Sequence, residues 1–188
     1  MKIVKSREKK NRRKNLVSIV KGVKMMITHA VWNNVTGLEH NGFKVGKGNT
    51  IEISEFNKMQ FYCSCLKDQN TPFNRFHVGN LKLTPRFLAY IIAWQLTPRK
   101  SNHAMLIEED LILIYCLMNK IKVNWIYVMK EHKIKSKRLV DYKFPFAVVV
   151  SKFLEYVEVD VKDDLIENIK SGSEIDCSTL VKMGFSKS

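Results

Sequence analysis

The side chains that could bind a metal ion stand close together at one place in the sequence. Cys63 and Cys65 are two residues apart, and His77 follows them. Zinc sites usually combine a CxxC pair with a second pair of ligands, and the CxC spacing here does not match that pattern. We therefore interpret both cysteines as small packing residues and expect neither a metal nor any other cofactor. Cys116 stands in an apolar stretch and is predicted to be a core residue.

Carboxylates could instead act as the metal-holding groups of a nuclease. A transposase-type site needs three carboxylates that converge on two metal ions, usually on a mixed sheet. The sequence predicts too few strands for such a sheet, so we interpret its carboxylates as helix-start charges, loop residues and solvated faces. The candidates are Glu108, Glu109, Asp110, Asp141, Asp160, Asp163, Asp164 and Asp176.

Acid–base and nucleophilic chemistry has no visible constellation either. The chain contains no P-loop, HExxH or GxSxG motif. None of its five histidines has an acid or thiol at a spacing typical of a general base. They are His29, His40, His77, His103 and His132. We expect His103 to cap or hydrogen-bond in the loop before the next helix. The sequence thus predicts a protein that is not an enzyme.

The densest functional signal is a run of basic residues at the N-terminus. Residues 1–14 hold eight Lys or Arg and one Glu, a net charge of +7, which is half of the +14 carried by the whole chain. Such a run suits nuclear import receptors and the phosphate backbone of DNA or RNA. The candidate nucleic-acid-binding or nuclear-import residues are Lys5, Arg7, Lys9, Lys10, Arg12, Arg13 and Lys14. A solvated tail without a partner stays open as an alternative.

A second basic stretch stands later in the chain, where we expect a helix to pass into a loop. Its secondary candidates are Lys130, Lys133, Lys135, Lys137 and Arg138. No helix-turn-helix, homeodomain or zinc-finger pattern is visible, so we expect no sequence-specific DNA readout. Any association with DNA or RNA would be electrostatic and non-specific.

The elements that must position these residues are mostly helices. With 188 residues and 45% apolar composition, we predict a disordered basic arm over 1–14 and a single, mainly α domain over 15–188. That domain is expected to contain six to eight helices and one small β-hairpin near residues 43–54, around Gly46-Lys-Gly48-Asn49. The longest apolar stretches, 87–94 and 111–118, are far below the roughly 20 residues that cross a bilayer, so no membrane span is expected.

Apolar spacing and capping residues place the individual helices. Residues 16–31 carry apolar side chains at helical spacing, and 84–96 and 108–118 are apolar enough to form the buried centre. Further helices are predicted at Trp125 to about Lys133, capped by Asn124, and at 145–157, where three valines leave a strand open. Two short helices at 163–170 and 178–183 end the series.

Several short motifs follow one another along the middle of the chain. They are Trp32-Asn33-Asn34, Val45-Gly-Lys47 through Ser54, Leu81-Lys-Leu-Thr-Pro85, Leu96-Thr-Pro98 with His103, Leu111-Ile-Leu-Ile-Tyr115, Ile121-Lys-Val-Asn124, and Phe144-Pro-Phe146 before Val157-Glu-Val159. In this order they resemble a plant transposon protein domain found in many plant retroelement-derived open reading frames. The resemblance covers roughly residues 28–160, and Ile175 to Gly184 resembles a segment often found downstream. It implies an origin and no agreed enzymatic activity.

Three functional hypotheses follow. The first is a non-catalytic, retroelement-derived plant protein that associates with nucleic acid through its arm, in a nuclear location because of the basic run, with the cytoplasm as the alternative. The second is a protein-interaction module of an element-encoded assembly, with an exposed apolar patch. The third, a remote one, is the remnant of a metal-dependent nuclease or transposase. The oligomeric state stays open, as does whether the chain is a fragment of a longer element protein.

Overall fold

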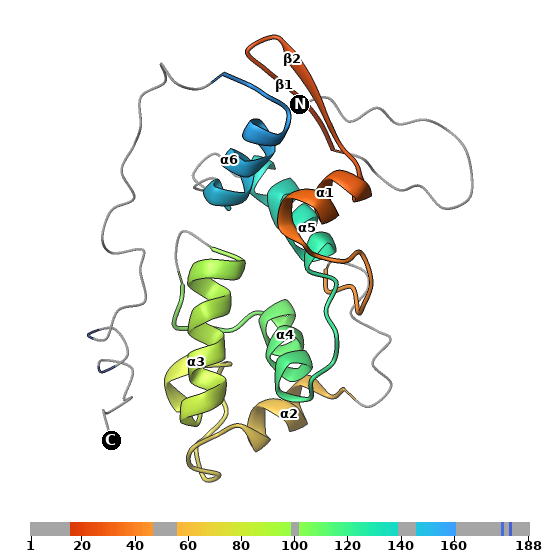
Figure 1. Ribbon diagram of the computed structural model, residues 1–188. Helices are drawn as coiled ribbons and strands as arrows, with labels where there is room; N and C mark the ends of the chain where they lie inside the picture. Colours follow the sequence, from red (N-terminus) through yellow and green to blue (C-terminus); the bar gives the residue numbers. More distant parts are fainter. Residues whose placement is uncertain are drawn as a thin grey trace. The chain divides into compact units, whose positions relative to one another are not determined.

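The computed structural model describes residues 16–46, 56–98, 102–138 and 146–160, with Ser178 and Val181. Within these ranges six α-helices and one two-stranded sheet form (Figure 1). The elements are β1 (Leu16–Val20), β2 (Val23–Ile27), α1 (His29–Thr36), α2 (Lys58–Ser64), the 3-10 turn η1 (Val78–Asn80), α3 (Leu83–Ile91), the π-helical segment η2 (Ile92–Leu96), α4 (Glu108–Met118), α5 (Trp125–Arg138) and α6 (Ala147–Tyr156). The predicted class, mainly α with one small β-hairpin, is confirmed.

The chain divides into two compact units. Residues 1–40 and 146–166 form the first unit, which holds β1, β2, α1 and α6. Residues 41–145 and 167–188 form the second, which holds the other elements. The single domain expected over 15–188 stays a prediction. In the described part of the chain no helix has both the length and the apolar character needed to cross a membrane.

The β-hairpin lies at the start of the described chain and corrects the predicted helix over 16–31. β1 and β2 pair antiparallel, from Leu16 opposite Ile27 to Val20 opposite Val23. Lys21 and Gly22 both have positive φ, 47° and 80°, as a tight hairpin turn requires. The spacing that suggested one helical face also suits two strands, and the many β-branched side chains favour the extended form. Helix begins only after the cap at Thr28.

The hairpin predicted near 43–54 is therefore misplaced in the sequence. Phe43 does not begin a hairpin strand; it forms a parallel bridge with Val123, donating its N–H to the Lys122 carbonyl at 2.7 Å. Gly42 has φ 97°, and a side chain there would come within 2.5 Å of the same carbonyl oxygen. Long-range pairing thus takes this segment, while 50–54 lies outside the described residues.

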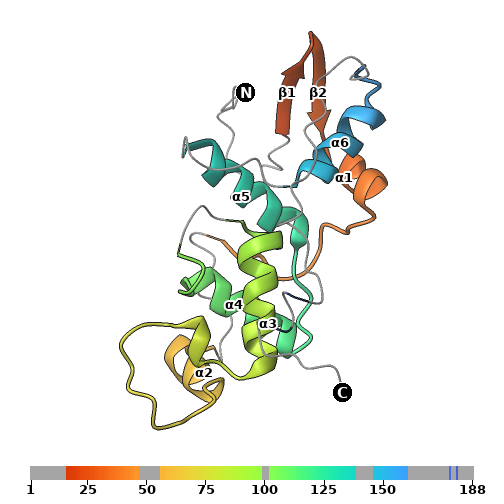
Figure 2. The same cartoon turned by 90° about the vertical axis from the view of Figure 1, so that its left-hand side faces the viewer.

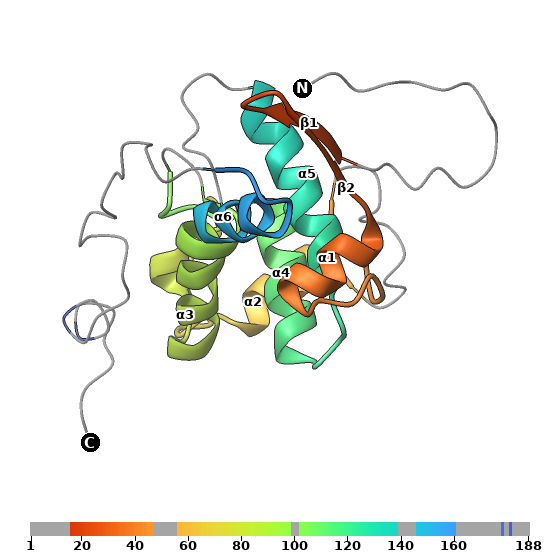
Figure 3. The ribbon, with the colours of Figure 1, turned by 45° about the horizontal axis from the view of Figure 1, so that its top comes forward.

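The first unit joins the hairpin to two helices. β2 runs directly into α1 (Figure 3), and α1 packs beside α6 (Figure 2). The contact is aromatic, since the Trp32 and Phe153 rings meet edge to face with centroids 4.8 Å apart, and both side chains are buried. Helix rather than strand thus forms at 147–156, which confirms the helical alternative for that stretch.

The second unit is built around α4. Its side chains from Leu111 to Ile114 are all buried, together with Cys116, which confirms that this helix is part of the buried centre. α3 packs against it and continues without a break into η2 (Figure 2). Ala89, Ile92 and Ala93 are the buried side chains of that pair beyond Pro85. Each large apolar side chain buried in this way stabilises the fold by about 1.5–3 kcal/mol.

The ends of the chain complete the comparison with the predicted elements. Asn124 caps α5 as predicted, because its Oδ1 accepts the Tyr127 N–H at 2.9 Å. α5 continues to Arg138, five residues beyond its expected end. The helices predicted at 163–170 and 178–183 lie outside the described residues, except that Ser178 and Val181 are helical.

Candidate functional site

The basic residues of α5 are the only part of the predicted nucleic-acid surface that the structure describes. The arm, residues 1–14 with all seven of its candidates, lies outside the described residues. In α5, Lys130 is buried, and burial lowers its pKa. Burial lowers the pKa of Lys133 as well. These two side chains are therefore poorly placed to meet phosphates.

Ion pairing accounts for the third basic side chain. Lys135 Nζ donates to Glu109 Oε1 at 2.8 Å, between α5 and the start of α4. Nothing is described of the side chains of Lys137 and Arg138. The three described members of the stretch thus face neighbouring parts of the fold, which corrects the expectation that the helix gives way to a basic loop after Lys133.

A cavity of about 140 Å³ opens beside this ion pair in the second unit. Its walls come from the 45–46 segment, the end of η2, the start of α4 and the middle of α5. The lining residues are Val45, Gly46, Thr97, Ile107, Glu109, Asp110, Leu113, Val128, Glu131, His132 and Lys135. Gly46 fits tightly here, since a side chain would meet Tyr127 at 3.0 Å.

The charged groups around the cavity are engaged in holding it together. Asp110 Oδ2 accepts the Ile107 N–H at 2.8 Å, and Glu109 accepts from Lys135. The His132 ring Nε2 lies 3.0 Å from the Pro98 carbonyl oxygen, which can only accept, so that nitrogen carries the proton. Ligand pockets are typically larger, on the order of 300 Å³ or more. The arrangement suits structural stabilisation better than binding or catalysis.

The carboxylates considered for a nuclease follow the structural interpretation where they are described. Glu108 is 3.7 Å from Lys58, Glu109 pairs with Lys135, and Asp110 closes the first turn of α4. Asp160 is exposed at the end of the described chain. The remaining candidates, Asp141, Asp163, Asp164 and Asp176, lie outside the described residues.

The cysteine and histidine group does not converge on a metal. Cys63 lies in α2 and Cys65 caps its end, with the second side chain buried. Burial is the main cause that raises the pKa of Cys65, and burial raises that of Cys116 to about 11. Among the described residues no three His, Cys, Asp or Glu side chains are grouped to hold a metal ion.

Comparisons with protein-family models, with curated proteins and with solved structures give no match for this chain. Its candidate sites must therefore be argued from their own residues.

An aromatic cluster at the end of α3 is the feature that sequence reasoning missed. The Trp94 and His103 rings stack with centroids 3.9 Å apart and planes 12° from parallel. Tyr90, one turn earlier, has its ring centroid 5.7 Å from that of Trp94. Trp94 nevertheless remains 44% exposed. We call Tyr90, Trp94 and His103 the Trp94 cluster; its third member was expected to cap or hydrogen-bond, and it stacks instead.

Two backbone features position this cluster. In η2 the Thr97 N–H donates to the Ile92 carbonyl at 2.7 Å, the i to i+5 bond of a π-helix. Such segments are rare and frequently occur at functional sites. Beyond His103, the chain pairs with the segment before η1, where the Leu106 N–H donates to the Phe76 carbonyl at 2.8 Å. The stack is therefore held from both sides.

The composition of the surrounding sequence was the signal that could have found this surface. Residues 69–107 contain no Asp or Glu, while five basic residues stand among them. They are Arg75, Lys82, Arg86, Arg99 and Lys100. Lys82, Arg86, Tyr90 and Trp94 are spaced four residues apart along α3 and η2, so they neighbour one another along the helix. We call these four residues the α3 row.

Proposed function

We propose that this chain is a non-catalytic protein of plant retroelement origin that associates with nucleic acid, without sequence specificity, through its basic arm. The observation that carries the proposal is the net charge of +7 on residues 1–14. A polyanion that binds such a segment releases condensed counterions, which supplies most of the affinity of non-specific binding. The order of motifs between Trp32 and Val159 supports the assigned origin.

The same basic run supports a nuclear location, because import receptors recognise dense clusters of Lys and Arg. The arm is favoured over α5 as the main contact, since two lysines of that helix are desolvated and a third is paired with Glu109. An arm that supplies the charge can follow a phosphate backbone without a shaped groove.

The test is the salt dependence of DNA and RNA binding at about 50 and 200 mM salt. In one variant the seven arm candidates from Lys5 to Lys14 are replaced by Gln. In the matched control, residues 2–14 keep their composition in a shuffled order. We expect the Gln variant to lose about 0.9 from the log–log slope on duplex DNA for each phosphate contact removed. The shuffled arm should retain the slope, and equal slopes for all three chains would contradict the proposal.

A second candidate function is protein binding through the outer face of the hairpin. In the register of the sheet, Val17 pairs with Met26 and Ile19 with Lys24 on one face. Ile19 is 69% exposed and Met26 54% exposed. Apolar side chains exposed on a two-stranded sheet support a protein-binding surface. Absence of nucleic-acid binding by the full chain at either salt concentration would favour this candidate over the first.

A further inference from the structure

We infer that the α3 row and the Trp94 cluster form a second nucleic-acid contact, one that stacks the unpaired bases of single-stranded DNA or RNA. The inference rests on the proposed function for the class of ligand, and it assigns a different site and a different strand state. It names one occupant, an unpaired strand, because stacking on side chains requires bases that are not already stacked in a duplex.

The geometry of the rings is the first argument. Proteins that bind single strands without sequence preference place aromatic side chains where successive bases can stack. Trp94 is 44% exposed although its ring already lies 3.9 Å from that of His103. A Trp fixed in one orientation by a neighbouring ring loses little freedom when a base joins the stack. Tyr90 extends the aromatic surface by one helical turn.

Charge is the second argument. Non-specific binding of a single strand needs a positive track beside the aromatic platform. Lys82, exposed at the start of α3, and the half-buried Arg86 lead along the helix toward the two rings. Within α3 and η2 no carboxylate interrupts this track, because residues 69–107 contain no Asp or Glu. The next carboxylates, Glu108 and Glu109, are paired with lysines.

The π-helical segment is the third argument. A regular α-helix closes its hydrogen bonds four residues apart, whereas the bond from Thr97 to Ile92 spans five. The extra residue is inserted in the turn that carries Trp94. In that turn Trp94 and Gln95 are exposed while Ile92 and Ala93 are buried. The departure from regular helix thus coincides with the exposed ring.

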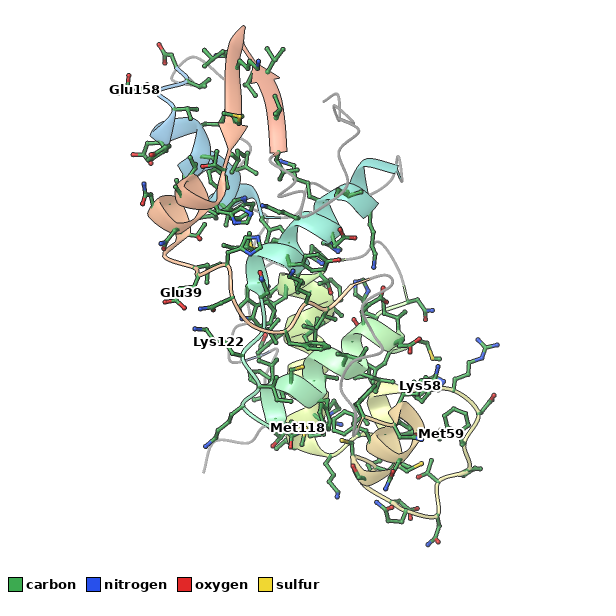
Figure 4. All side chains as sticks on the ribbon, turned by 90° about the vertical axis from the view of Figure 1, so that its right-hand side faces the viewer. Glu39, Lys58, Met59, Met118, Lys122 and Glu158 are labelled. Atoms are coloured by element: carbon green, nitrogen blue, oxygen red, sulfur yellow. The ribbon has the colours of Figure 1, made fainter. Side chains whose placement is uncertain are left out.

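The experiment measures the binding of the full chain to a single-stranded oligonucleotide of about 20 nucleotides, longer than the site of one typical binding fold. Trp94→Ala should weaken binding about tenfold, the lower part of the range expected for loss of one base stack, without changing the salt slope. Trp94→Phe should keep most of the affinity. Met118→Ala, at the end of α4 (Figure 4), is the control, because Met118 has the same 44% exposure and lies outside the acid-free segment. It should bind as the unmodified chain does.

A second measurement does not depend on a destabilising substitution. Binding of the single strand should quench the tryptophan fluorescence of the unmodified chain, and Trp94→Phe should remove most of that quenching while anisotropy still reports binding. Equal affinity of the Trp94→Ala and unmodified chains, or quenching that survives in Trp94→Phe, would overturn this inference. Either result would leave the arm proposal standing, because that proposal is judged by the salt slope of the Gln-substituted arm. Binding of neither single strands nor duplexes by the full chain would overturn both.

Discussion

At the scale of single residues, the clearest distinction between structure and chemistry concerns Asp110. A carboxylate at the start of a helix beside a cavity could belong to a catalytic site. Asp110 is only 1% exposed, and its Oδ2 accepts the Ile107 N–H at 2.8 Å. An unpaired amide at a helix start costs free energy when it is buried, and a carboxylate there also meets the positive end of the helix dipole. The residue therefore holds the first turn of α4.

The substitution Asp110→Ala tests this role. We expect it to lower the free energy of unfolding by about 1–2 kcal/mol, because the Ile107 N–H loses its acceptor. Asp110→Asn should cost less, since its amide oxygen can still accept. Glu108→Ala is the control; that side chain is half exposed and its contact with Lys58 is 3.7 Å long, so the change should stay within about 0.5 kcal/mol. Urea midpoints measure all three, and equal midpoints for both Ala variants would refute the assigned role.

At the scale of elements, the hairpin shows how a turn decides between two patterns. The β1 and β2 sequences carry apolar side chains that satisfy helical spacing and strand alternation alike. The two residues between them, Lys21 and Gly22, adopt positive φ, which a helix does not contain. Lys21 also donates from Nζ to the Asp160 carbonyl at 2.9 Å, within the same unit. The turn and this contact together stabilise the hairpin.

Substituting Gly22 by Ala should destabilise the hairpin by about 1 kcal/mol, because an L side chain at positive φ is strained. Hydrogen exchange of the β1 and β2 amides should become about fivefold faster, in proportion to the local opening. Gly79→Ala is the matched control: a side chain there meets no atom within 4 Å, and its φ is not in the positive range. It should leave hairpin exchange unchanged. Unaltered exchange in Gly22→Ala would mean that the turn does not limit the hairpin.

At the scale of the whole molecule, apolar burial and charge are separated along the chain. The main core cluster lies entirely in the second unit, from Val45 to Val128, with α4 supplying most of its fully buried side chains. Half of the net charge stands in residues 1–14. A strongly positive segment next to an ordinary globular body lowers the charge density that the packed core must tolerate.

Replacing Leu113 by Asp should unfold the second unit. Leu113 is buried in α4, and an unpaired carboxylate in a core costs several kcal/mol, a large part of the stability of a domain. Far-UV circular dichroism should show loss of helix, and the cooperative thermal transition should disappear. Met118→Asp, in the same helix at an exposed position, should retain both. A Leu113→Asp chain with unchanged helix content and melting temperature would contradict the assignment of the core.

The helices that sequence reasoning located correctly are those with local signals. The acidic first turn and apolar run of α4, and the Asn124 cap of α5, each act within one or two turns of the backbone. The candidate site was predicted less well. His103 was expected to cap or hydrogen-bond, and its stacking on Trp94 depends on the pairing of distant segments at Phe76 and Leu106.

By itself, the sequence determined the helical class, the position of α4, the basic run over 1–14 and the absence of acidic residues over 69–107. These are properties of composition and of neighbours within a few residues, so no fold is needed to read them. Tertiary structure alone decided that 16–27 is a hairpin, that Lys130 is buried, and that Trp94 stacks on a histidine nine residues away. The physical reason is that burial, ion pairing and ring stacking are set by which distant segments meet, and the energy of those contacts outweighs local preference.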